Sequence, residues 1–176
     1  MSQNQGKQFE KDFQDSVPSH VFCKRFKDNA ASFSGGAGTR FTSTNECDFM
    51  LYDRGRLYFL ELKSTLSSLT YWRKDFKSKN VNIKKNQIEG LLEARGYGIV
   101  SGFLFNFRNT EENETFFVDI REFVAYTSLP FLKKSINRGD VLEMNPIRIE
   151  SRKLRVNHGY DIEGFLLDTV EKFDVL

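Results

Sequence analysis

The sequence predicts an α/β fold built on a mixed β-sheet with helices on both sides, and three patterns carry this prediction. Residues 3–17 show apolar side chains four positions apart, as on the buried face of an amphipathic helix. Residues 47–63 contain two β-prone apolar runs around a short polar turn, which is the pattern of a β-hairpin. Residues 83–95 have helical spacing and lead into the apolar run 99–107. A strand, a helix and a second strand in this order predict a right-handed crossover within one sheet.

The first helix is expected to bury Phe9, Phe13 and Val17 against one side of the sheet. A short strand at 21–26 follows it. Residues 27–46 are rich in glycine and serine and have no apolar periodicity, so a loop is expected there rather than another element of the sheet.

Helix 83–95 is expected to cover the other side of the sheet with Ile88, Leu91 and Leu92, and the glycines that follow favour its end. The later patterns predict, in order, a strand at 114–118, short helices at 120–127 and 130–137, a last strand at 146–150 and an amphipathic helix at 160–173. No internal repeat or change of composition divides the chain, so a single domain spanning residues 1–176 is expected.

Composition restricts the chemistry available to the chain. The net charge is only +2, and no run approaches the ~18–20 apolar residues of a membrane span. The N-terminus is polar and lacks the apolar segment of a signal peptide, so a cytosolic protein is expected. The two cysteines, Cys23 and Cys47, do not make a disulfide framework, and with the two histidines they match no zinc pattern. Catalysis is therefore expected to depend on carboxylates and lysines.

Asp48, Glu61 and Lys63 are the strongest candidates for such chemistry. If the hairpin turn centres on Arg54 and Gly55, Asp48 lies opposite Glu61, with Cβ atoms roughly 4.5–5.5 Å apart, and Lys63 points to the same face. Facing carboxylates repel each other, whereas a divalent cation attracts both, because hard cations prefer oxygen ligands. The pattern favours a metal-dependent nuclease site, in which Lys63 holds a water or a phosphate oxygen beside the metal. A register shifted by one residue would separate the two acids and leave an ordinary amphipathic hairpin.

A basic segment with interleaved aromatic residues lies between the hairpin and helix 83–95. Residues 71–86 contain six basic residues and the single acid Asp75, in a chain of net charge +2. Such a segment suits a surface that follows DNA phosphates, and a solvated charged loop is the alternative. The candidates for DNA contact are Arg73, Lys74, Lys77, Lys79, Lys84 and Lys85. A second basic cluster near the C-terminus is interpreted as a solvated face and consists of Arg148, Arg152, Lys153 and Arg155.

The order of these motifs resembles the PD-(D/E)xK nucleases, and more closely the RecU family of Holliday junction resolvases from Gram-positive bacteria and their phages. The segment Gly6-Lys7-Gln8-Phe9-Glu10 is similar to the N-terminal motif of that family, and the hairpin from Asp48 to Lys63, with Gly55-Arg56 in its turn, is similar to its catalytic hairpin. The resemblance covers about residues 6–126 and also includes Asn82-Ile83, Gln87-Ile88 and the stretch from Gly98 to Phe107.

This resemblance implies a restriction-endonuclease-like PD-(D/E)xK core and a homodimeric endonuclease that resolves four-way DNA junctions by paired nicking with Mg²⁺ or Mn²⁺, with recombination proteins as further partners. It makes Asp48 and Glu61 metal ligands, and it makes Lys63 the residue that activates the attacking water or stabilises the scissile phosphate. Glu10 becomes a further acid that approaches the metal from the first helix, and Gln87 assists from the next helix. Without the resemblance, Glu10 and Gln87 are ordinary polar positions on helices.

The chain departs from the RecU pattern in two places. The family usually has threonines immediately before the hairpin aspartate, whereas Glu46 and Cys47 precede it here, and Glu46 could be a substitute. The family also has a stalk that enters the junction, and here residues 27–46 are expected to form a flexible loop or reduced stalk, with Arg40 as its candidate for DNA contact. Two other functions stay open: a nuclease of the same fold that cuts flaps, ends or single strands, and a non-catalytic DNA-binding module.

Overall fold

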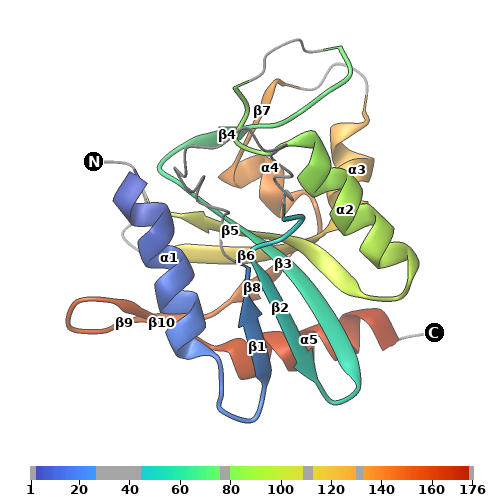
Figure 1. Cartoon of the computed structure of the whole chain (residues 1–176). Coiled ribbons are helices and arrows are strands. Elements are labelled where there is room, and N and C mark those ends of the chain that lie inside the picture. Colours follow the sequence, from blue (N-terminus) through green and yellow to red (C-terminus); the bar gives the residue numbers. More distant parts are fainter. Residues whose placement is uncertain (1–2, 27–44, 76–79, 109–112, 130–132, 175–176) are drawn as a thin grey trace, which may run out of the picture.

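The computed structural model describes residues 3–26, 45–75, 80–108, 113–129 and 133–174 (Figure 1). In chain order the elements are α1 (Gln3–Ser16), β1 (Phe22–Arg25), β2 (Phe49–Asp53), β3 (Arg56–Thr65), β4 (Ser68–Thr70), α2 (Lys85–Gly96), β5 (Val100–Phe107), β6 (Glu114–Asp119), α3 (Ile120–Thr127), β7 (Ser135–Asn137), α4 (Arg138–Leu142), β8 (Ile147–Ile149), β9 (Ser151–Lys153), β10 (His158–Tyr160) and α5 (Ile162–Asp174). Nearly all of the predicted loop 27–46 lies outside the described residues, as do Arg40, Lys77 and Lys79.

The main sheet has the strand order β1-β2-β3-β5-β6-β8. The strands β1, β2 and β3 pair antiparallel, β3 pairs in parallel with β5 through the crossover helix α2, and β6 pairs antiparallel with β5 and β8. This mixed sheet confirms the predicted α/β fold. The order α1-β1-β2-β3-α2-β5, with an antiparallel hairpin and a parallel crossover, is that of the restriction-endonuclease-like core.

Each face of the sheet has its own hydrophobic core. Phe13 of α1 and Phe165 of α5 pack on one face with Leu60, while Leu91 of α2 and Phe123 of α3 pack on the other. Successive residues of a strand point to opposite faces, so Glu61 and Lys63 lie on the face that α2 covers. Placement of the two helices on opposite faces was predicted and is confirmed.

The hairpin β2–β3 has the predicted register. Its Cα pairs run from Phe49 opposite Leu60 to Asp53 opposite Arg56. The turn between them has positive φ at Arg54 (48°) and Gly55 (81°), which suits a tight two-residue turn that follows the twist of the strands. Continued by one residue, this register sets Asp48 opposite Glu61.

Two predictions in the C-terminal half are wrong. No helix spans 130–137 in the described part of that segment, because Ser135–Asn137 forms β7 and pairs with β4. The Asn137 side chain then accepts a hydrogen bond from the backbone N–H of Asp140 and starts α4, so the helix begins later than predicted. The strand at 146–150 is not the last, because the hairpin β9–β10 follows it and packs beside α1 (Figure 1). Strands of three residues are too short to show a periodicity in the sequence.

Helix α2 also differs from its prediction. It begins at Lys85, because Ile83 is extended and fully buried, in a β-bridge with Tyr71. Leu92 was expected to face inward but is 41% exposed, and the small residues Gly90 and Ala94 are buried instead. Small side chains let the helix lie close to its neighbours, and this preference overrides the apolar pattern. Among the described residues no helix is long and apolar enough to cross a membrane.

Candidate active site

Four of the predicted catalytic residues meet on the α2 face of the sheet. Lys63 Nζ donates a hydrogen bond to Glu61 Oε1 at 2.8 Å, and Gln87 Nε2 donates to the same oxygen. Asp48 lies near enough for its charge to raise the pKa of Glu61. Strand β3 supplies Glu61 and Lys63, the residue before β2 supplies Asp48, and the first turn of α2 supplies Gln87.

Asp48 is fixed by hydrogen bonds on both sides. Its backbone N–H donates to the Leu60 carbonyl at 3.0 Å, and its backbone carbonyl accepts from the Phe26 N–H at 2.8 Å. Its side-chain Oδ2 accepts from the Leu62 N–H at 2.7 Å, so the carboxylate takes the place of a backbone partner at the end of the β2–β3 pairing. The carboxylate is thereby held next to the peptide that carries Glu61.

Gln87 links the start of α2 to the buried acid. Its Oε1 accepts a hydrogen bond from the backbone N–H of Lys84 at 2.9 Å, while its Nε2 donates to Glu61. The bond to Lys84 satisfies one backbone donor just before the helix and sets the amide so that its N–H groups point to the carboxylate. Gln87 is therefore an orienting residue for Glu61.

Glu61 is the acid of the site whose pKa is raised. The residue is only 3% exposed, and burial is the largest cause that raises its pKa to about 7. The charges of Asp48 and Glu10 raise the pKa further, whereas Lys63 lowers it. Within the described part of the chain, no hydrogen bond reaches Glu61 Oε2 (both donors contact Oε1). A buried carboxylate with one oxygen left open beside a second acid fits a cation.

The donor set is compatible with Mg²⁺ or Mn²⁺. No group of three or more His, Cys, Asp or Glu side chains that could hold a metal ion occurs in the described ranges. Two carboxylates suffice for Mg²⁺, because this ion keeps several waters and usually takes one or two carboxylates together with substrate phosphates. Asp48 and Glu61 are the residues that would hold it.

Glu10, the fifth candidate, is placed differently. It lies on α1 and forms an ion pair with Arg25 of β1, and its charge still contributes to the raised pKa of Glu61. Nothing in the sequence signals Arg25, since the pair forms only where α1 crosses β1. The sequence also contains no signal that Cys47 lies beside the active site. Burial, and then the charges of Glu61 and Asp48, raise the pKa of the Cys47 thiol to about 12.

The described part of the predicted DNA-binding segment leads into the start of α2. Lys74, Lys84 and Lys85 are exposed, and the Lys85 ammonium lies 5.4 Å from the centre of the Trp72 ring. Arg73 is engaged with Asp75 at 2.8 Å. Lys84 and Lys85 therefore lie just before Gln87 at the start of α2, whereas Arg40, Lys77 and Lys79 lie outside the described residues.

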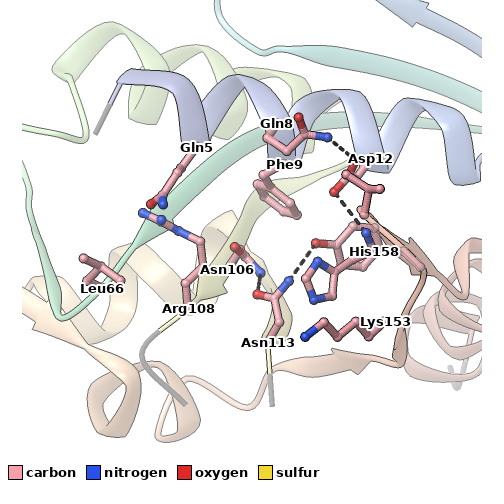
Figure 2. Close-up of a pocket in the computed structure, with 12 residues that line it drawn as sticks. Gln5, Gln8, Phe9, Asp12, Leu66, Asn106, Arg108, Asn113, Lys153 and His158 are labelled. Carbon is pink, nitrogen blue, oxygen red and sulfur yellow. Dashed lines mark hydrogen bonds between the residues drawn. The ribbon is translucent and has the colours of Figure 1, made fainter. Parts of the chain in front are cut away.

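A polar pocket on the α1 face had no signal in the sequence analysis. It has a volume of about 370 Å³ and lies between α1, the ends of β3 and β5 and the β9–β10 hairpin (Figure 2). Asn106 and Arg108 line it from the end of β5, and His158 lines it from β10, far along the chain. Because no local motif joins these residues, only the tertiary structure brings them together.

Comparison with known proteins shows the family to which the chain belongs. No model of a known protein family matches it. A solved structure of Hjc, a Holliday junction resolvase from the archaeal hyperthermophile Archaeoglobus fulgidus, aligns with 73% of this chain and 83% of its own at 15% identity, with a TM-score of 0.42, a likeness too distant to inform function. The SPbeta prophage-derived uncharacterized protein YotM of Bacillus subtilis (strain 168) is 32% identical over 182 residues, which cover 96% of this chain and 88% of the relative. Identity at this level along nearly the whole of both proteins shows that the chain belongs to the family of the prophage protein YotM.

Proposed function

We propose that the chain is a metal-dependent DNA endonuclease that resolves four-way junctions. The observation that supports this proposal most is the convergence of Asp48, Glu61, Lys63 and Gln87 on one face of the sheet, where no hydrogen bond from the described residues reaches Oε2 of the buried Glu61. The RecU resemblance supplies the substrate class, and the exposed lysines at the start of α2 suit a polyanion.

The residues of the site have distinct roles in this proposal. Asp48 and Glu61 hold Mg²⁺ or Mn²⁺, which when bound would polarise the phosphodiester and lower the pKa of a bound water. Gln87 orients Glu61 through their hydrogen bond. Lys63 places an ammonium beside Glu61, where it can donate to the attacking water or to a phosphate oxygen and offset developing negative charge. Glu10 is the further acid, acting on Glu61 through its charge.

We also propose a homodimer, because two symmetric cuts across a junction need two sites related by a two-fold axis. The prophage origin of the relative supports a phage origin for this chain, with action on DNA in the cytoplasm of a bacterial host beside recombination proteins.

A cleavage assay on four-way, flap and linear DNA, each with EDTA, Mg²⁺ or Mn²⁺, tests the proposal. Paired nicks in the junction that require metal, and that both Asp48→Asn and Glu61→Gln abolish, are expected. Glu93→Gln is the matched control, because Glu93 is an exposed acid on α2 that pairs with no DNA-contact candidate among the described residues.

The other outcomes are equally informative. Cutting of flaps or ends in preference to junctions would indicate another nuclease of this fold. Binding without cleavage in either metal would indicate a non-catalytic DNA-binding module. Wild-type rates in both acid variants would contradict the assignment of the site.

A further inference from the structure

The pocket on the α1 face has a strongly polar wall at the end of the sheet (Figure 2). Arg108 directly follows β5, and its backbone N–H donates to the Thr65 carbonyl at 3.0 Å, so it extends the pairing of β3 with β5. Its side chain lies on the face opposite the active site. The residue two positions before it, Asn106, is 1% exposed and forms part of the same wall.

A chain of hydrogen bonds orients the Arg108 guanidinium. Its Nε donates to Ser64 Oγ at 2.7 Å, and Ser64 Oγ donates to Asn106 Oδ1 at 2.8 Å. Asn106 Nδ2 in turn donates to Thr115 Oγ1 at 3.0 Å and to Asn113 Oδ1 at 2.5 Å. The amide of Asn106 is thus fully used, and Nε of Arg108 is occupied. No hydrogen bond from the described residues engages the two terminal nitrogens of the guanidinium.

Arg108 has no ion pair with any residue of the described ranges, although it is partly buried. Burial lowers the pKa of its guanidinium, which indicates that an anion would be favoured there. A guanidinium held by Nε presents its remaining N–H groups as a fork that matches two oxygens of a phosphate.

The other charges of the pocket are divided between its two ends. Asp12 is 3% exposed, and its oxygens accept from Gln8 Nε2 at 2.6 Å and from the His158 backbone N–H at 3.2 Å. Figure 2 shows Asp12 beside His158 at one end and Arg108 beside Leu66 at the other. Lys153, the second cation of the lining, pairs with His158 in the β9–β10 hairpin and so lies at the Asp12 end. Among the lining residues, the Arg108 end therefore has a cation without a carboxylate beside it.

We propose that this pocket binds a backbone phosphate of the DNA strand that is cut, with Arg108 as its principal donor. The proposal rests on the proposed nuclease function and adds to it a phosphate contact away from the scissile bond. Ser64 immediately follows Lys63, and Leu66 at the rim is 57% exposed. The three residue steps from Lys63 to Leu66 span ~10 Å of strand, about three nucleotide rises of ~3.4 Å. Passage from one face of the sheet to the other lengthens this path, so the contact is expected roughly three to five nucleotides from the cut.

Equilibrium binding of a labelled four-way junction in EDTA, where no cleavage occurs, tests the contact. Arg108→Gln is expected to weaken binding and to reduce the slope of log affinity against log salt by roughly 0.7–0.9, the value for one lost phosphate contact. Arg108→Lys is expected to keep most of the slope and lose part of the affinity, because it keeps the charge without the fork. Arg121→Gln, which removes an exposed charge on α3, is the control and should leave both unchanged. Thermal unfolding confirms that each variant is folded.

Single methylphosphonate substitutions along the cut strand locate the contact. At one position roughly three to five nucleotides from the cut, the neutral group should weaken wild-type binding but leave Arg108→Gln unaffected. Equal sensitivity of the two proteins at every position, or a wild-type slope in Arg108→Gln, would overturn the inference while leaving the nuclease proposal intact. A wild-type protein that neither binds nor cuts DNA would overturn both.

Discussion

Glu61 shows at the scale of one residue how burial, charge and hydrogen bonding combine. Its carboxylate is enclosed by the α2 face of the sheet, shares one oxygen between Lys63 and Gln87, and lies near Asp48. In water a glutamate is ionised at neutral pH, whereas here burial and neighbouring acids favour the protonated form. The same features that strain the metal-free protein would favour a divalent cation.

The stability of the metal-free protein should therefore depend on the pH through Glu61. The pKa of Glu61 is raised from 4.5 to about 7 on folding, so between these values the folded protein binds more protons than the unfolded one. This contribution is fully present below pH 4.5 and is lost as the pH rises through 7, by at most roughly 3 kcal/mol. Denaturant unfolding in EDTA from pH 4.5 to 8 measures it.

Glu61→Gln should remove this part of the pH dependence and should be more stable than the wild type at pH 8 without metal. Addition of Mg²⁺ should stabilise the wild type most at the alkaline end and should have little effect on Glu61→Gln. The exposed Glu89→Gln is expected to retain the wild-type slope. An identical pH dependence in Glu61→Gln and wild type would exclude Glu61 as its source.

Lys63→Ala should lower the cleavage rate by a larger factor than it weakens metal binding. Lys63 donates to Glu61 but cannot ligate a cation while it is protonated, so its loss removes stabilisation of the phosphate or water, with a cost of roughly 10²-fold in rate. Single-turnover cleavage and Mg²⁺ titration measure the two effects. A loss of metal affinity as large as that of Asp48→Asn would contradict this role.

At the scale of an element, helix α2 positions Gln87, and Gly90 sets how α2 meets the chain before β2. A Cβ at Gly90 would lie 2.6 Å from the Cβ, Cγ and Cδ of Glu46, so the side chain of Glu46 crosses the helix at this point. Glu46 is thereby used for packing against α2. The resemblance to RecU suggested another role for it, as a substitute for the threonines of that family.

Gly90→Ala should destabilise the protein by about 1–2 kcal/mol, because the overlap with Glu46 outweighs the helix propensity that alanine usually adds. Cleavage should also slow, since the shift reaches Gln87 one turn earlier. Urea unfolding of Gly90→Ala, Glu46→Gly and the double variant measures the coupling between the two positions, because the Cβ of Glu46 is itself part of the overlap. The double variant should recover most of the lost stability, and Gly96→Ala, with nothing within 4 Å of its Cβ, is the control. Strictly additive effects would mean that the two residues do not interact.

For the whole molecule, the proposed junction preference depends on the segment 27–46 between β1 and β2. The segment 27–46 leaves β1 and returns to β2 at neighbouring points, because the Phe26 N–H donates to the Asp48 carbonyl at 2.8 Å. The β1–β2 pairing therefore holds the two ends of this segment together whatever its length. A change in its length is expected to carry only a small entropic cost.

Deletion of residues 34–40 should leave folding, Mg²⁺ binding and some nicking intact while the preference for four-way junctions over duplex is lost. Competition binding and cleavage rates on the two DNA forms measure this preference. Replacement of 34–40 by a glycine-serine segment of equal length separates the effect of its sequence, including Arg40, from that of its length. Unchanged selectivity in both variants would assign junction recognition to the rest of the DNA-binding surface.

Local sequence patterns determined the α/β class, helix α1, the α3 helix and the hairpin that presents Asp48, Glu61 and Lys63. These elements are set by interactions between near neighbours: apolar side chains one turn apart, and a two-residue turn at Arg54 and Gly55 that fixes the register. Three-residue strands and the exposure of Leu92 depend instead on partners far along the chain. The ion pair of Glu10 with Arg25, the contact of Glu46 with Gly90, and the bonds from Arg108 through Ser64 to Asn106 have no local signature. Only the tertiary structure decided them, because each forms where separate elements are packed together by the two hydrophobic cores.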